Sequence, residues 1–246
     1  QDADEAEQFW LNALADVPRS LDLPLDYPAP EERAFKGNLA STVIDQALQE
    51  QLKNYAESRN VTLSTFMFTA FNVLLYKYTG QQEFCTGLSI ANRNQHQLEE
   101  LIGFFVNVLP VPIALSEDMD MEVLLGKVNK QVEQALDYQH YPVDRLVQKL
   151  CPDREANRQP LFNVAFGFQN FLDLNLQHGH SDLNKTDLPS ALNAEAMPLT
   201  YRSSKFDLTL FVSDLNNRIA LDLEYDTELF DHNTVEAMLS NYVHFL

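Results

Sequence analysis

The stretch from Ser64 to Tyr78 constrains the fold most strongly, because it has helical spacing and is apolar on nearly every side. A helix with one apolar stripe covers one face of a core, whereas a helix that is apolar all round must be enclosed by other elements. Gly80 follows at the position where a glycine commonly ends a helix. The sequence therefore predicts a central buried helix.

Alternating apolar and polar residues predict β-strands on both sides of this helix. The strand-like segments are 39–44, 83–91, 104–114, 161–169, and a hairpin of 205–213 with 218–226 around Asn216 and Asn217. Helical spacing predicts further helices at 3–17, after residue 44, at 121–138, in a short segment with Pro142 in its first turn, and after a capping Asp231. This mixture predicts an α/β fold in which helices cover a mixed sheet.

The segment Leu161–Gln169 has the clearest alternation in the chain. Its apolar positions are Phe162, Val164, Phe166 and Phe168, and the positions between them are Asn163, Ala165, Gly167 and Gln169. Successive side chains of a strand point to opposite faces of the sheet. We therefore predict a strand with one apolar face and one face of small or polar residues.

Length and charge restrict the classes of protein to consider. A chain of 246 residues with 45% apolar content can bury the core of one large domain or lobe. Its 36 acidic and 17 basic side chains give a formal charge of −19, which makes unassisted binding to nucleic acid or to an anionic membrane unfavourable. No segment has the roughly 20 consecutive apolar residues of a membrane span, and the first residues lack the features of a signal peptide. A cytoplasmic protein is expected.

Common catalytic and metal-binding motifs are missing from the sequence. It has no GxSxG turn and no phosphate-binding glycine loop, and Cys85 and Cys151 belong to no CxxC pair. The two cysteines are expected to be small buried hydrophobic residues. His178, His180 and Asp182 would together offer two imidazoles and a carboxylate. Ligand spacing alone is a weak signal, so a polar loop is the preferred interpretation and no metal site is predicted.

Four short motifs stand out, in this order along the chain. They are IGFFVN from Ile102, YQHYPVDRLV from Tyr138, RQPLFNVAF from Arg158 with FQN ending at Asn170, and FDLTL from Phe206. With FWLNAL and LDLPLDYP near the start and LEYDTELFD before the last helix, they resemble the C-terminal half of nonribosomal peptide synthetase condensation domains. The resemblance covers nearly the whole chain. It implies that residues 1–246 form the C-terminal lobe of the two-lobed chloramphenicol-acetyltransferase-like fold.

The resemblance implies that the parent domain forms an amide bond between acyl or aminoacyl groups. These groups are held as thioesters on the 4′-phosphopantetheine arms of peptidyl or acyl carrier proteins. Family members carry HHxxxDG in the N-terminal lobe, where the second histidine acts on the acceptor amine, and none of the six histidines here has a histidine neighbour. Such a group must lie within hydrogen-bond reach of the reacting nitrogen. We therefore expect no catalytic residue and no covalently bound cofactor in this chain, and no activity without an N-terminal lobe as partner.

Four residues receive roles from the resemblance. Asn107 and Gln169 are expected to face the substrate tunnel or the pantetheine arm, with a hydrogen bond at a strand end as the alternative for either side chain. Arg93 and Asp207 are expected to make structural lobe contacts. Arg93 matches an arginine that contacts the aspartate of HHxxxDG, although Asn92 replaces the glycine that usually precedes it. Asp207 is also expected to anchor the hairpin.

Two alternatives stay open at this point. The chain could be a non-catalytic module that docks carrier proteins or a partner subunit, or it could be the lobe of an epimerization or heterocyclization domain. Both enzyme types share the architecture that the resemblance implies. Residues 171–204 form a long polar segment without a sustained period, similar to the latch or crossover loop by which this family joins its two lobes.

Overall fold

A computed structural model describes residues 2–93, 96–99, 101–152, 159–169, 203–215 and 218–246. Seven helices lie in this part of the chain: α1 (Asp2–Ala13), α2 (Gln46–Ser58), α3 (Leu63–Thr79), α4 (His96–Glu99), α5 (Met121–Asp137), α6 (Val143–Leu150) and α7 (His232–Phe245). The strands described are β1 (Gly37–Ile44), β2 (Glu83–Ile90), β3 (Asn107–Ala114), β4 (Val164–Gln169), β5 (Leu208–Leu215) and β6 (Arg218–Asp226). The predicted α/β class is confirmed.

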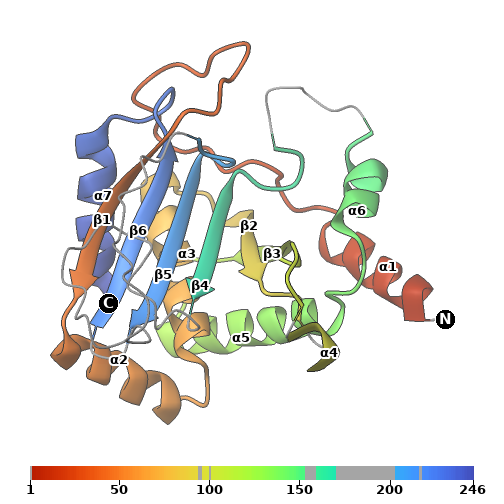
Figure 1. Cartoon of the computed structure of the whole chain (residues 1–246), viewed down its shortest axis with the longest axis horizontal. Coiled ribbons are helices and arrows are strands. Elements are labelled where there is room, and N and C mark those ends of the chain that lie inside the picture. The colour runs from red at the N-terminus through yellow and green to blue at the C-terminus, as the bar shows by residue number, and fades with distance from the viewer. Residues whose placement is uncertain (1, 94–95, 100, 153–158, 170–202, 216–217) are drawn as a thin grey trace, which may run out of the picture.

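The six strands form one mixed sheet in the order β1-β6-β5-β4-β2-β3. The central pairs β2–β4 and β4–β5 are parallel, and the outer pairs β1–β6, β5–β6 and β2–β3 are antiparallel. Strands β2, β4 and β5 therefore end at the same edge of the sheet, which we call the C-terminal edge. In Figure 1 this edge lies at the bottom of the sheet.

Helices cover one face of the sheet, which we call the back face (Figure 1). Phe166 on β4 points to this face and packs against Phe68 and Phe71 of α3, with ring centroids 5.4 and 6.1 Å apart. Helix α3 carries eleven buried residues, as expected for a helix that is apolar all round, and Gly80 ends it in the left-handed conformation. Helix α7 packs on β1 and β6, α5 packs on β3, and α2 lies against α3 and β6.

The opposite face, which we call the front face, carries small and polar side chains on β4 and several on its neighbours, together with Phe211 on β5. Strand pairing places Gly167 beside Ser89 and Phe211, and it places Thr209 beside Ala165 and Glu224. Directly paired residues share a face, so all of these side chains lie on the side away from α3. The prediction of one apolar and one small or polar face is thus confirmed for the part of the segment that forms β4.

Two predicted strands are shorter in the structure. The strand expected at 104–114 begins only at Asn107, because β2 ends at Ile90, the partner of Asn107, and leaves residues 104–106 without a neighbouring strand. The strand expected at 161–169 begins at Val164. Phe162 therefore does not follow the alternation, and its ring lies against Gly87 on the front face, where an added β-carbon would come within 2.3 Å of it.

The predicted hairpin and final helix are confirmed. Strands β5 and β6 pair from Leu208–Tyr225 to Leu215–Arg218, and the Asp231 carboxylate accepts a hydrogen bond from the Asn233 amide as the N-cap of α7. The predicted turn residues Asn216 and Asn217 lie outside the described residues, as does the possible latch at 171–204 except for its last two residues. Pro142 precedes α6 as its N-cap instead of lying within the first turn.

Helices α1 and α6 pack together at one side of the sheet (Figure 1). The buried Trp10 indole donates a hydrogen bond to the Tyr138 carbonyl at the end of α5, and Phe9 stacks on the Tyr138 ring. The proline-rich segment after α1 runs without regular structure back to β1, with Leu21 and Leu23 buried. We call residues 20–33 the strap.

Candidate functional site

Three of the four residues singled out in the sequence lie at or next to the C-terminal edge of the sheet. Asn107 begins β3 opposite Ile90, the last residue of β2, and Gln169 is the last residue of β4. Arg93 follows β2 by three positions. The parallel arrangement of β2 and β4 brings these chain ends together, because parallel strands end on the same side of a sheet.

Asn107 and Gln169 share this edge but not one face. Asn107 pairs with Ile90, whereas Gln169 pairs with Ser213, whose hydroxyl donates a hydrogen bond of 3.5 Å to the Gln169 side-chain Oε1. Ser89 pairs with Gly167, so strand alternation places Gln169 on the front face and Asn107 in the adjoining back-face row. The Asn107 side-chain oxygen accepts a hydrogen bond from the Val108 amide at 2.9 Å. Of the two, Gln169 is therefore the front-face residue.

Arg93 organises the chain that leaves β2. Its guanidinium donates hydrogen bonds to the carbonyls of Leu98 and Leu101, the latter at 2.9 Å, and lies 4.3 Å above the Phe105 ring. Asn92, where the family usually has glycine, takes φ of 52°. Asparagine tolerates this left-handed conformation better than most side chains, so position 92 can adopt it without a glycine.

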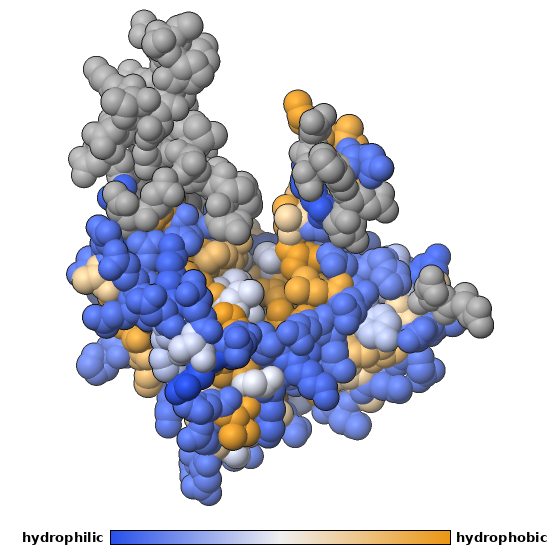
Figure 2. All heavy atoms as spheres, turned by 90° about the horizontal axis from the view of Figure 1, so that it is seen from below, coloured by the Kyte–Doolittle hydropathy of each residue, from blue (hydrophilic) through white to orange (hydrophobic). Residues whose placement is uncertain are grey.

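The segment 101–106 is the most exposed apolar part of the described chain. Ile102 and Phe104 are fully exposed, at 105% and 93%, and Leu101 and Val106 are exposed by 51% and 53%. Figure 2 views the molecule from the C-terminal edge and shows hydrophobic residues on a projection and in a hollow beside it. Four large apolar side chains in six residues are unusual for a free surface and indicate contact with another protein surface.

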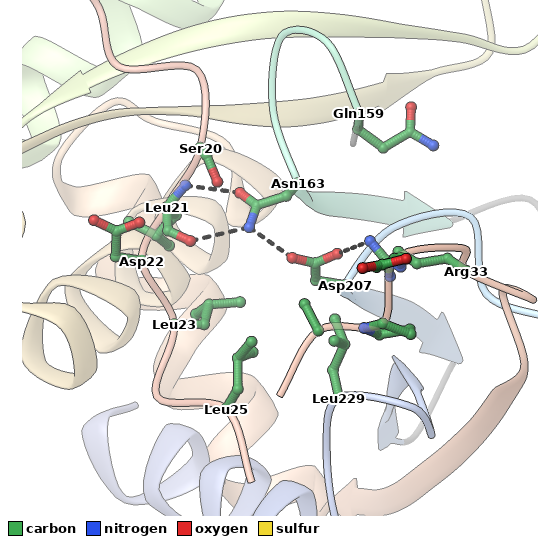
Figure 3. Close-up of a pocket in the computed structure, with 13 residues that line it drawn as sticks. Ser20, Leu21, Asp22, Leu23, Leu25, Arg33, Gln159, Asn163, Asp207 and Leu229 are labelled. Carbon is green, nitrogen blue, oxygen red and sulfur yellow. Dashed lines mark hydrogen bonds and ion pairs between the residues drawn. The ribbon is translucent and has the colours of Figure 1, made fainter. Parts of the chain in front are cut away.

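Asp207 lies at the opposite edge of the sheet, in a pocket of about 370 Å³ between the strap and the starts of β4 and β5 (Figure 3). Its carboxylate accepts hydrogen bonds from Arg33 at 2.5 Å and from the Asn163 amide at 2.7 Å. Asn163 also pairs with both backbone polar groups of Leu21, and Arg33 forms a second ion pair with Asp226 at 2.6 Å. The network thus holds the strap against the sheet.

The network favours the charged form of Arg33. Burial opposes the charged form of Arg33, but the hydrogen bonds to Asp226 and Asp207 and the charges of both carboxylates outweigh it and raise the Arg33 pKa. Arg33 and Asn163 were not predicted as members of a site. Asn163 interrupts an apolar run in the motif RQPLFNVAF, and this polar residue could have indicated a structural role. No sequence pattern, however, connects Asn163 or Arg33 to Asp207.

The described residues contain no grouping of three or more His, Cys, Asp or Glu side chains that could hold a metal ion. His178, His180 and Asp182 lie outside the described part of the chain. Cys85 and Cys151 are buried, as expected, and burial raises the pKa of the Cys85 thiol, which disfavours the reactive thiolate. Among the described helices, none has the length and apolar character needed to cross a membrane.

The C-terminal edge therefore offers amide and hydroxyl groups beside an exposed apolar segment, which suits binding and positioning of an uncharged ligand. The chain is 35% identical over 241 residues to tyrocidine synthase 3 of Brevibacillus parabrevis, covering 98% of this chain and 4% of that protein. It thus spans a small part of this curated relative.

Solved structures share the fold. A four-domain nonribosomal peptide synthetase bound to AMP and glycine matches with a TM-score of 0.82 and 24% identity over 100% of this chain and 19% of that one. The X-domain in complex with OxyB from teicoplanin biosynthesis matches with a TM-score of 0.85 and 21% identity over 100% of this chain and 52% of that one. The mixed sheet with helices is thus the expected chloramphenicol-acetyltransferase-like architecture. The family model for the condensation domain matches residues 1–246, and the chain belongs to the condensation-domain family.

Proposed function

We propose that the chain is the C-terminal lobe of a condensation domain in a nonribosomal peptide synthetase. The complete domain forms an amide bond between acyl or aminoacyl groups that carrier proteins hold as thioesters on 4′-phosphopantetheine arms. Membership of the family supports this reaction, as does the similarity to a synthase named for the peptide tyrocidine. The product class is a peptide secondary metabolite such as an antibiotic.

The exposed segment 101–106 is the observation that carries this proposal. Burying Leu101, Ile102, Phe104 and Val106 in another lobe would remove a large apolar surface from water. The segment precedes β3 at the same C-terminal edge of the sheet as Gln169, so a lobe that covers this edge would enclose both the segment and the open part of the front face. That arrangement is what a substrate tunnel between two lobes requires.

The proposed division of labour follows from the side chains that this lobe offers. The sequence has no HHxxxDG, so we assign the group that acts on the acceptor amine to the N-terminal lobe. Gln169 and Asn107 are assigned to hydrogen bonding of the pantetheine arm or the substrate amides at the tunnel edge. Arg93 is assigned a structural lobe contact through the segment that it holds, and Asp207 is assigned a structural role at the strap. Proximity and orientation of the two thioesters would supply much of the rate.

The first prediction is that this chain alone forms no amide product and that an N-terminal lobe with HHxxxDG restores the reaction. Donor and acceptor carrier proteins loaded with thioesters are incubated with the chain, with the N-terminal lobe, and with both, and products are measured by mass spectrometry. We expect turnover only in the third sample. Product from the isolated chain would contradict the proposal. A joined protein whose second histidine is replaced by alanine is the control and should be inactive.

A second candidate is a non-catalytic module that docks a partner protein. The X-domain match favours it, because that structure is a complex with OxyB and aligns over the whole of this chain. The same experiment separates the two functions. A module that only docks would bind the N-terminal lobe or a carrier protein without forming product. Epimerization would appear as an inverted stereocentre on the carrier-bound product, and heterocyclization as loss of water from it.

A further inference from the structure

A row of four residues crosses the front face close to the C-terminal edge. Ser89 pairs with Val108 on one side and with Gly167 on the other, and Gly167 pairs with Phe211. These residues come from β3, β2, β4 and β5 in that order, and all four point away from α3. None of these four is charged. The row continues on β6 with Asp222, which pairs with Phe211, but this carboxylate is buried and accepts a hydrogen bond from the Ser41 hydroxyl.

Phe211 lies across Gly167. A β-carbon added to Gly167 would come within 3.0 Å of the Phe211 Cδ1 atom and 3.3 Å of its Cε1 atom. Such distances are closer than ordinary van der Waals contact, so a side chain at position 167 would require the Phe211 ring to shift by a few tenths of an ångström. The absence of a side chain on Gly167 allows the ring to lie close to the β4 backbone.

The row marks the place where the front face opens. Gly87, Ala165 and Thr209, two positions nearer the middle of the sheet, are buried, whereas Val108, Ser89 and Phe211 are partly exposed. Figure 2, seen from the C-terminal edge, shows a hollow with hydrophobic residues beside the projection. Of the next front-face residues, Gln169 is partly exposed and offers an amide, whereas Ser213 is buried and its hydroxyl donates to the Gln169 side chain. A ligand here would be uncharged, with apolar groups over the row and amides near Gln169.

We propose that the Phe211–Gly167 pair determines which acyl or aminoacyl groups the tunnel accepts, by limiting the depth of the hollow. This inference rests on the proposed function. The ring occupies space that a bulky substrate side chain would need, so the chain selects uncharged groups with small or flat side chains. Truncation of Phe211 deepens the hollow, and a side chain at position 167 makes it shallower.

The test joins this chain to an N-terminal lobe and measures kcat/KM for carrier-bound alanyl and tryptophanyl groups, each offered in turn as donor and as acceptor. In Phe211→Ala we expect the ratio of tryptophan to alanine to rise about tenfold, on whichever side the hollow serves, because one missing group in an apolar pocket changes discrimination by that order. Phe211→Leu should give a smaller increase and Gly167→Ala a decrease. Val43→Ala, on the same face at the far edge strand, is the matched control and should leave the ratio unchanged.

A binding measurement keeps this test separate from the proposed function. N-acetylcysteamine thioesters of alanine and tryptophan are titrated into the isolated chain, and the Gly167 amide resonance is followed by NMR. Tighter tryptophanyl binding to Phe211→Ala than to the natural chain, in the absence of turnover by the joined protein, would support the pair and contradict the proposed function. If the joined protein turns over but the tryptophan-to-alanine ratio of kcat/KM is unchanged in all three variants, the role proposed for the Phe211–Gly167 pair is wrong and the proposed function stands. Unchanged binding of both thioesters in a folded Phe211→Ala chain would also overturn the role of the pair.

Discussion

At the scale of single residues, the strap network shows why one carboxylate can matter to the stability of the whole chain. Asp207 accepts hydrogen bonds from Arg33 on the strap and from Asn163 before β4. The Arg33 side chain is only 6% exposed, so water cannot replace a lost partner easily. A buried charge or amide that loses its partner costs more than the pair contributes when intact.

The second prediction is that Asp207→Ala lowers the free energy of unfolding by about 3 kcal/mol, because it leaves an Arg33 N–H and an Asn163 N–H without an acceptor. Urea denaturation followed by circular dichroism measures the change. Asp22→Ala removes an exposed carboxylate from the wall of the same pocket and should alter stability by less than about 0.5 kcal/mol. Equal effects of the two substitutions would show that the network contributes nothing specific.

At the scale of elements, α1 is attached to α6 by a carboxylate that two donors share. Glu7 accepts hydrogen bonds from the Lys149 ammonium and from the Tyr141 hydroxyl, the latter at 2.5 Å. The hydrogen bond from Lys149, followed by that from Tyr141, lowers the Glu7 pKa below its ordinary value of 4.5. A group whose pKa is lower in the folded state stabilises the fold above its unfolded pKa, and this contribution is lost as pH falls through the folded pKa.

The third prediction is that Glu7→Gln lowers the melting temperature at neutral pH by a few degrees at most, and that this difference from the natural chain is lost as the pH falls through the lowered pKa of Glu7. Thermal unfolding across a pH series measures it. Glu117→Gln, in the exposed loop before α5, removes the same charge without these contacts and is the control. A melting difference that persists unchanged at acid pH would mean that the Glu7 contacts are not electrostatic.

At the scale of the whole molecule, two features have opposite effects on self-association. The formal charge of −19 opposes contact between copies of the chain, whereas the exposed apolar segment 101–106 favours it. Like charge keeps copies of the chain apart at low ionic strength, and salt screens this repulsion within roughly 10 Å at 0.1 M and less at higher concentration. Once the repulsion is screened, the apolar segment can associate with another protein surface. The same balance would favour a partner lobe that covers the segment over a second copy of this chain.

The fourth prediction is that the isolated chain self-associates as salt rises to about 0.5 M, because the repulsion is screened while apolar attraction remains. Sedimentation velocity measures the average mass. The double substitution Ile102→Asp with Phe104→Asp should keep the chain monomeric and should also weaken its binding to an N-terminal lobe. Val123→Asp changes another half-exposed apolar residue, on α5, and should do neither. Association that is unaltered by the double substitution would place the contact elsewhere.

The sequence by itself determined the element types and the family. Helical spacing in Ser64–Tyr78 and strict alternation in the hairpin require burial of particular faces, and this local requirement can be read without knowing any partner. The same holds for the Asp231 cap, which depends on a contact two residues away. The motifs, in turn, predicted the family and three of the residues that gather at one sheet edge.

Only the tertiary structure decided which residues meet. Asp207 and Arg33 are separated by 174 positions, and nothing in the local sequence indicates their ion pair. The boundary of β3 depends on where β2 ends, so the exposure of Phe104 was hidden behind a strand-like pattern. The Phe211–Gly167 contact likewise follows from the parallel register of β4 and β5. Periodicity reports the face that a residue occupies within its own element, whereas register between distant strands is set by the packing of the complete sheet.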